Sequence, residues 1–164
     1  MSDALEITTG AMPAFVSYSN SDGGFVASAV VDAMHACGVD VLWDGDLERI
    51  LPLSIPAWIE TSIRDRAVLV IVTEDYVKAL STNDCTDHLG VRYEAGLVRQ
   101  KIYDHGGASR CPVLPVVPPG MAVNSLPWVL RQRVLHTFDP LTRGGVEQLV
   151  RSVVALGQGQ ERSA

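Results

Sequence analysis

Residues 67–72 read Ala-Val-Leu-Val-Ile-Val, an unbroken apolar run in which four of the six residues are β-branched. A run without polar alternation is typical of a strand that is covered on both faces, as strands are in parallel sheets. Parallel neighbours need long crossover connections, which are usually helices. The run therefore predicts a parallel sheet, with strands and helices alternating on either side of it in the sequence.

The rest of the chain follows that alternation. Short apolar runs end at polar or glycine-containing clusters, and between them apolar residues recur at helical spacing. The five predicted strands are residues 14–18, 39–43, 67–72, 111–117 and 134–138. The predicted helices are residues 25–37, 56–65, 90–104 and 145–156, with short helical turns at 76–80 and 126–132. This order predicts a flavodoxin-like α/β fold, a five-stranded parallel sheet with helices on both faces.

Local signals add detail to this prediction. Phe25 is the first of the apolar residues that recur at helical spacing in the first helix. Ser21 or Asp22 precedes that helix and is placed to cap it. Pro112 and Pro115 limit backbone pairing in the fourth strand and favour a position near the edge of the sheet.

Length and composition describe an ordinary globular domain. The 164 residues are enough for one hydrophobic core, and the net charge of −6 argues against a nucleic-acid partner. The sequence contains no membrane-spanning apolar run and no secretory signal, and its three cysteines fit no disulfide framework, so we expect a cytoplasmic protein. We expect residues 1–13 to be a flexible lead-in, 14–156 the domain and 157–164 a flexible tail.

Several common functional motifs are missing. The first predicted strand is not followed by Gly-x-Gly-x-x-Gly, and neither a Walker sequence nor a Gly-x-Ser-x-Gly elbow occurs. Cys85 and His88 have the spacing of a metal-binding pair, but no second pair follows at a suitable distance. We therefore expect no dinucleotide fingerprint and no metal site.

Glu94 does not fit a purely structural interpretation of its helix. The apolar stripe beside it comprises Val91, Ala95, Val98 and Ile102. None of the residues three or four positions away can pair with a carboxylate. A carboxylate among apolar groups should have a raised pKa, which makes it a candidate functional group. The alternative is that Glu94 is a boundary residue that turns outward or caps a loop. Gly90, one turn earlier, leaves space beside the carboxylate.

Ligand sites of parallel α/β sheets lie at the carboxyl ends of the strands. Aromatic and polar side chains occur at two of these ends, namely Tyr18, Ser19, Trp43 and Asp44. The aromatic rings either stack on a ligand or pack at the rim of the core. The long connection after the second strand carries a group of apolar residues, Ile50, Leu51, Leu53 and Ile55. This group is either folded onto the core or exposed as an interaction surface.

Six segments, in the same order, resemble the sequence boxes of TIR domains and, more closely, of their SEFIR relatives. They are residues 15–19 (Phe-Val-Ser-Tyr-Ser), 38–44, 56–60, 68–76, 90–94 (Gly-Val-Arg-Tyr-Glu) and 111–114. Each motif alone is weak, but six in order are specific, and the resemblance extends over nearly all of residues 14–156. It implies the three-layer α/β sandwich of TIR domains.

TIR-type domains either cleave NAD⁺ or assemble with one another as signalling adaptors. In the members that cleave NAD⁺, the catalytic group is a glutamate on the helix that corresponds to residues 90–104. The resemblance therefore implies that Glu94 is catalytic, that NAD⁺ is the substrate and that no cofactor is required. It also implies a set of substrate-binding residues, which are Tyr18, Ser19, Trp43, Asp44, Ile55, Trp58 and Gly90.

The leading hypothesis is a SEFIR/TIR-like NAD⁺ glycohydrolase, a defence or cell-death effector that is activated by self-association. The loop 44–56 would make the contact through Ile50, Leu51 and Leu53. Bacterial members of both groups are associated with antiphage defence by NAD⁺ depletion. The alternative is a non-catalytic adaptor that binds other SEFIR or TIR domains through the same loop. A third hypothesis is an enzyme that makes cyclic ADP-ribose instead of hydrolysing NAD⁺.

Overall fold

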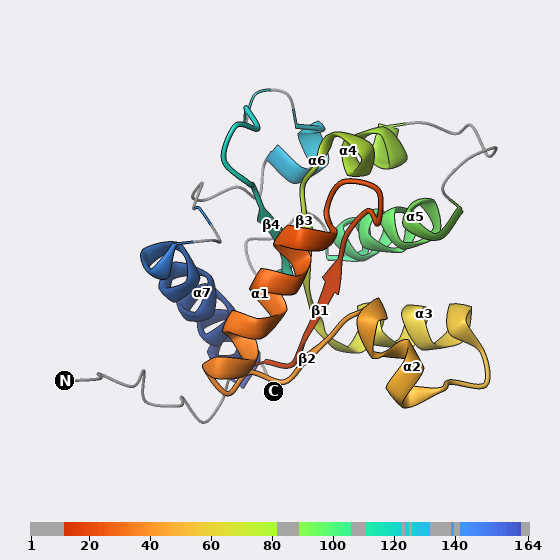
Figure 1. Cartoon of the computed structure of the whole chain (residues 1–164), viewed down its shortest axis with the longest axis horizontal. Coiled ribbons are helices and arrows are strands. Elements are labelled where there is room, and N and C mark those ends of the chain that lie inside the picture. Colours follow the sequence, from red (N-terminus) through yellow and green to blue (C-terminus); the bar gives the residue numbers. More distant parts are fainter. Residues whose placement is uncertain are drawn as a thin grey trace.

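Four parallel strands form the sheet at the centre of the molecule (Figure 1). They are β1 (Ala14–Ser17), β2 (Val41–Leu42), β3 (Ala67–Ile71) and β4 (Val113–Val116), in the order β2-β1-β3-β4. The computed structural model describes residues 12–81, 89–105, 111–122, 124, 126–131, 139 and 142–161. The predicted parallel α/β sheet is confirmed with these four strands. The fifth predicted strand, 134–138, lies outside the described residues.

Helices cover both faces of the sheet, as predicted. Helices α1 (Gly24–Ala36) and α7 (Arg143–Glu161) pack on one face, and α3 (Ile55–Asp65) and α5 (Leu89–Asp104) cover the other (Figure 1). The shorter elements are the 3₁₀ turn η1 (Asp44–Asp46) and the helices α2 (Leu47–Ile50), α4 (Glu74–Ser81) and α6 (Trp128–Arg131). In the described part of the chain, no helix is both long and apolar enough to cross a membrane.

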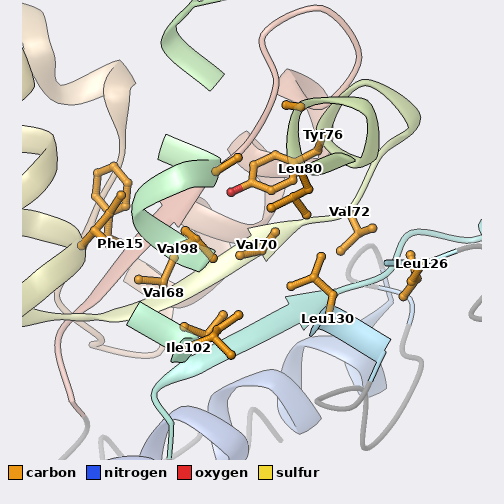
Figure 2. Packing of buried hydrophobic residues seen from close by; sticks show 14 of the residues in the cluster. Phe15, Val68, Val70, Val72, Tyr76, Leu80, Val98, Ile102, Leu126 and Leu130 are labelled. Carbon is orange, nitrogen blue, oxygen red and sulfur yellow. The ribbon is translucent and has the colours of Figure 1, made fainter. Parts of the chain in front are cut away.

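Successive residues of the strands face opposite layers of the core. In β1, Phe15 belongs to the hydrophobic cluster beneath α3 and α5, whereas Val16 belongs to the cluster beneath α1 and α7. Val70 of β3 and Val98 of α5 lie in the same cluster as Phe15 (Figure 2). Because side chains alternate along a strand, Ser17 shares the face of Phe15 and points toward the α5 layer.

The first helix differs from its prediction at its beginning. Its N-cap is Gly23 instead of Ser21 or Asp22, and Phe25, the first residue of the apolar pattern, is 78% exposed. The buried face of α1 consists of Ala27, Val30, Val31 and Met34. Phe25 lies about 200° around the helix from Ala27, because each residue advances about 100°. The apolar residues of this helix therefore spread over more of its circumference than the sheet covers.

The bounds of helices α7 and α3 differ from the prediction, whereas the position of strand β4 agrees with it. Helix α7 continues to Glu161, so the segment from residue 157 that was predicted as a flexible tail is helical as far as that residue. Helix α3 begins at Ile55, one residue earlier than predicted, because Ser54 is its N-cap and accepts a hydrogen bond from the Ala57 amide at 3.4 Å. Strand β4 is one of the two edge strands of the described sheet, and its two prolines predicted a position near an edge.

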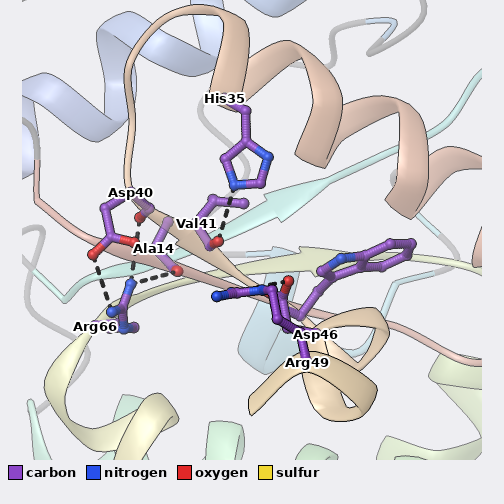
Figure 3. Close-up of polar contacts among 8 residues, drawn as sticks. Ala14, His35, Asp40, Val41, Asp46, Arg49 and Arg66 are labelled. Atoms are coloured by element: carbon purple, nitrogen blue, oxygen red, sulfur yellow. Dashed lines mark hydrogen bonds and ion pairs between the residues drawn. The ribbon is translucent and has the colours of Figure 1, made fainter.

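Arg66 ties together the amino ends of three strands. Its guanidinium donates to Asp40 Oδ2 at 3.0 Å and to the carbonyl oxygens of Ala14 and Asp40, each at 3.4 Å (Figure 3). Ala14 begins β1, Asp40 precedes β2 and Arg66 precedes β3. This contact lies at the amino ends of the strands, which is the opposite end of the sheet from the carboxyl ends.

Lys101 fastens α5 to the end of α3. Its Nζ donates to the carbonyl oxygens of Ile63 at 2.5 Å, Arg64 at 3.0 Å and Arg66 at 2.7 Å. The last carbonyls of a helix have no donor within the helix, so the lysine supplies what α3 lacks. Lys101 is buried, and desolvation lowers the pKa of its amine. The α3–α5 layer is therefore held by a charged contact as well as by apolar packing.

Candidate functional site

Glu94 lies on α5 beside the carboxyl end of β1, and only 8% of its surface is exposed. Ser17, the last residue of β1, donates its hydroxyl hydrogen to Glu94 Oε2 at 2.6 Å. The Tyr76 hydroxyl, from α4, lies 2.9 Å from the same Ser17 oxygen. Ser17 and Tyr76 are fully buried. The carboxylate is thus held inside the protein by residues from three different elements.

Burial raises the pKa of Glu94 from its ordinary value of 4.5 to about 7. The hydrogen bond from Ser17 favours the ionised form and opposes this rise, and the negative charge of Asp44 adds to it. The raised pKa that the apolar neighbours predicted is confirmed. A carboxyl group that titrates near neutral pH is typical of general acids, general bases and other catalytic groups.

Tyr18, Trp43 and Asp44 meet at the ends of β1 and β2. The Tyr18 hydroxyl donates to Asp44 Oδ1, and the centroid of its ring lies 5.8 Å from that of Trp43. Burial and the bond to Asp44 raise the pKa of Tyr18, and the charge of Glu94 adds to this rise. Gly45 leaves room for the Trp43 ring, because a Cβ at that position would overlap it. Three of the predicted site residues therefore form one group, and two of them, Tyr18 and Asp44, interact electrostatically with Glu94.

The loop after β1 is fixed by polar contacts of its own. Ser19 is buried, and its Oγ lies 2.8 Å from the Oγ of Ser21. Asp22 accepts hydrogen bonds from Thr73 Oγ1 at 2.6 Å and from the Asp75 amide at 3.1 Å. Asp22 therefore caps α4 and not α1, and its negative charge lies at the N-terminus of α4, where it is favourable. This arrangement holds the loop against the carboxyl end of β3.

The other predicted substrate residues have different surroundings. Gly90 is exposed one turn before Glu94, and a Cβ there would meet nothing within 4 Å. Ile55 is 48% exposed at the start of α3. Trp58 packs edge-on against Phe15, with ring centroids 5.7 Å apart and planes at 74°. Within the described ranges, no hydrogen bond or ring contact joins these three residues to Glu94.

The apolar group on the connection after β2 is exposed and not folded onto the core. Leu51 is 76% exposed and Leu53 fully exposed, while Ile50 is half-buried. Leu51 ends α2 in the left-handed backbone conformation, with φ 47°. Of the two interpretations that the sequence left open, the exposed surface is the one that the structure supports.

Sequence reasoning did not identify Ser17 or Tyr76. A signal for Ser17 existed, because it is the polar residue that ends β1 on the same face as Phe15. Tyr76 likewise ends the TIR-like segment 68–76. What no local pattern reveals is that Ser17 contacts residues 59 and 77 positions away in the chain.

The site offers a titratable carboxylate, a second carboxylate at Asp44 and an aromatic pair. Carboxylates placed in this way can stabilise positive charge that develops on a ligand. Over the described ranges, no three side chains among His, Cys, Asp and Glu come together to hold a metal ion. Cys85 and His88, the pair considered in the sequence, lie outside the described residues.

Comparison with known proteins adds information about the fold. No protein-family model and no curated protein matches the chain. Among solved structures, the chain is similar to a metazoan TIR-STING receptor from C. gigas, with a TM-score of 0.55 and 17% sequence identity. The match covers 85% of this chain and 39% of the receptor chain. This likeness supports an α/β fold similar to a TIR domain, with a parallel sheet flanked by helices.

Proposed function

We propose that this domain is a SEFIR/TIR-like NAD⁺ glycohydrolase with Glu94 as its catalytic carboxylate. The observation that carries the proposal is the buried position of Glu94 at the carboxyl end of β1, with a pKa of about 7. The TIR-like fold supports it, because the sequence resemblance assigns the catalytic glutamate of NAD⁺-cleaving TIR domains to this helix. NAD⁺ is the substrate, and no further cofactor takes part.

The reaction breaks the bond between C1′ of ribose and the nitrogen of nicotinamide. The bonding electron pair leaves with nicotinamide, which changes from a cationic ring to a neutral molecule, so no general acid is required. The ribose passes through an oxocarbenium-like state, as in glycoside hydrolysis. Water then adds to C1′ and loses a proton. In its ionised form Glu94 stabilises the positive charge on the ribose and binds the ribose hydroxyls.

The proposed substrate site extends from Glu94 over the neighbouring strand ends. We expect Tyr18, Trp43 and Asp44 to form its wall. The contacts among these three residues and the electrostatic effect of Asp44 on Glu94 support this assignment. Ser19 belongs to the same strand end. The outer part of the proposed site consists of Ile55, Trp58 and Gly90, and the open space at Gly90 supports access from that side.

Self-association through the loop 44–56 is part of this proposal. Leu51 and Leu53 expose their apolar side chains on a surface loop, as interaction sites do. Activation by assembly suits a defence or cell-death effector, because NAD⁺ depletion must stay off until it is triggered.

Release of nicotinamide from NAD⁺ by concentrated, assembled protein tests the enzymatic proposal. We expect wild type to release nicotinamide and Glu94→Gln to be slower by about a hundredfold or more, because the charge that stabilises the transition state is gone. Glu147→Gln, in a surface ion pair on α7, is the matched control and should keep the wild-type rate. An inactive wild type, or a Glu94→Gln variant as active as wild type, contradicts the proposal. Separation of cyclic from linear ADP-ribose identifies the product.

A non-catalytic adaptor is the second candidate function, and the exposed loop favours it equally. Leu51→Glu combined with Leu53→Glu should convert assemblies to monomers in light scattering, because the contact would bury two charges. Phe25→Glu is the control, since Phe25 is 78% exposed but lies on α1. Unchanged assemblies in the loop variant contradict the role of the loop in both functions. Loop-dependent assemblies that release no nicotinamide favour the adaptor.

A further inference from the structure

Two buried hydroxyl groups and the carboxyl group of Glu94 form a chain of hydrogen bonds inside the protein. Tyr76 OH lies 2.9 Å from Ser17 Oγ, and Ser17 Oγ lies 2.6 Å from Glu94 Oε2. Tyr76 is 0% exposed and Ser17 is 0% exposed, so neither hydroxyl can contact a substrate. Both nevertheless lie within two hydrogen bonds of the group proposed to contact it.

Hydrogen counting gives the chain a direction. A serine hydroxyl has one hydrogen, and an ionised carboxylate can only accept, so Ser17 donates to Glu94. The Tyr76 hydroxyl must then be the donor to Ser17. In the ionised state the Tyr76 hydroxyl therefore donates to Ser17 Oγ, and the Ser17 hydroxyl donates to Glu94 Oε2. Among the described residues nothing donates to Oε1, which leaves that oxygen for a ligand.

We propose that Ser17 and Tyr76 are positioning residues that anchor Oε2 of Glu94, fix the orientation of the carboxylate and stabilise its ionised form. The inference rests on the proposed function for its catalytic meaning, because it assumes that Glu94 is the group that acts on the ribose. Its structural content is separate, because the ionisation of Glu94 can be measured without any substrate.

The surroundings of Glu94 make this support necessary. The other groups that face it are acidic or phenolic. Asp44, after β2, raises the pKa of Glu94, and Tyr18, directly after β1, already donates its hydroxyl hydrogen to Asp44. Among the described residues, Glu94 forms no ion pair with a basic side chain. Among the described residues, the hydrogen bond from Ser17 is the only contact that favours the ionised form of Glu94.

The test is a direct titration of Glu94. In protein labelled with ¹³C at the glutamate side-chain carboxyl, the Glu94 signal is identified by its loss in Glu94→Gln. We expect Ser17→Ala to raise the pKa of Glu94 by about one unit, the size expected for one hydrogen bond to a charged group. Tyr76→Phe keeps the packing and removes only the hydroxyl, so it should give a smaller shift in the same direction. Ser62→Ala, at a buried serine of α3, should leave the titration unchanged.

The rate of NAD⁺ cleavage gives a second readout. In both variants the acid limb of the pH–rate profile should move upward by the amount measured in the titration, and the rate should recover toward wild type at high pH. A variant that is merely damaged would be slow at every pH. If Ser17→Ala does not fold, Tyr76→Phe alone decides the matter through its titration.

The outcomes separate this inference from the proposed function. Wild-type titration of Glu94 in both variants contradicts the positioning role, whether or not the protein cleaves NAD⁺. Shifted titrations in a protein that releases no nicotinamide support the positioning of the carboxylate and contradict the glycohydrolase. Shifted titrations with matching rate profiles support both.

Discussion

Glu94 and Lys101 are two buried charged side chains on the same helix, yet their surroundings differ. They are seven residues apart, close to two helical turns, so they project from nearly the same face of α5 about 10 Å apart along its axis. Their exposed fractions are almost equal, 8% for Glu94 and 7% for Lys101. The lysine uses all three of its hydrogens on carbonyl oxygens at the end of α3, whereas the glutamate accepts one hydrogen bond.

This difference separates a structural charge from a functional one. An ammonium group has three donors and no acceptor, so Lys101 has no capacity left for a ligand. A carboxylate can accept about four hydrogen bonds, so most of the acceptor positions of Glu94 remain unused. Because the charge is buried with few hydrogen bonds, the pKa of Glu94 is raised. Burial of a charge alone does not identify a site. The number of unused hydrogen-bonding positions distinguishes the two residues.

Removal of the saturated charge should have the largest effect on stability. Lys101→Met keeps the apolar stem but leaves three carbonyl oxygens without their donor, so we expect the free energy of unfolding to fall by about 4 kcal/mol. For a chain of this size that corresponds to a melting temperature lower by roughly 10 °C. Lys78→Met is the control, because Lys78 is the only other lysine and its side chain is 71% exposed, and an exposed ion pair such as its contact with Asp75 contributes about 0.5 kcal/mol. Equal losses of unfolding free energy in the two variants would contradict the structural role of Lys101.

Removal of the unsaturated charge should act in the opposite direction, and only above acidic pH. The unfolded chain ionises Glu94 near pH 4.5, whereas the folded protein holds the proton to about pH 7. Between these values the folded state binds more protons, so its stability falls as pH rises. Glu94→Gln lacks this loss and should gain about 3 kcal/mol over wild type between pH 4 and pH 8. Urea unfolding across this pH range measures the difference, and Glu147→Gln should show no comparable trend.

A smaller effect should follow from the neighbouring carboxylate. Asp44 contributes to the raised pKa of Glu94 but is a lesser cause than burial. Asp44→Asn keeps an acceptor for the Tyr18 hydroxyl and removes the charge, so the pKa of Glu94 should fall, opposite in sign to Ser17→Ala. We expect a shift of about half a unit in the carboxyl titration. Asp46 lies on the same turn and is paired with Arg49, so Asp46→Asn should leave the titration of Glu94 unchanged.

The smallest effect concerns the helix that joins the two charges. Gly96 lies between them, and a Cβ there would meet nothing within 4 Å. Gly96→Ala should therefore raise the free energy of unfolding by about 0.5 to 1 kcal/mol, because alanine loses less conformational entropy in a helix. Gly45→Ala is the opposite case, since its Cβ would overlap the Trp43 ring and lower stability. Thermal unfolding of the two variants should show shifts of opposite sign.

Much of the fold could be predicted because its signals are local. The run 67–72 contains β3 (Ala67–Ile71), and the apolar stripe from Val91 to Ile102 forms the face of α5 that packs on the core. The prediction was wrong at the beginning of α1, whose N-cap is Gly23 and not Ser21 or Asp22, and at the end of α7. The closing strand expected at 134–138 lies outside the described residues, so it stays a prediction.

The residues of the candidate site that have local signals could be predicted in the same way. Glu94 was identified because its apolar neighbours on α5 are visible in the sequence, and its raised pKa follows from their burial of the carboxylate. Ser17 and Tyr76 were not identified, because their importance arises from contacts across 77 and 59 residues. Lys101 was unremarkable in the sequence for the same reason, since its partners lie 35 to 38 positions earlier.

The sequence by itself determined the class of fold and the position of an unusual carboxylate, because strand runs, helical spacing and apolar neighbours act within a few residues along the chain. Only the tertiary structure decided which buried charge is satisfied. Hydrogen bonds require donors and acceptors within about 3 Å, and the partners of both Glu94 and Lys101 come from other elements. The packing of β1, α3 and α4 against α5 therefore gives the two charged residues different roles, a structural one for Lys101 and a proposed catalytic one for Glu94.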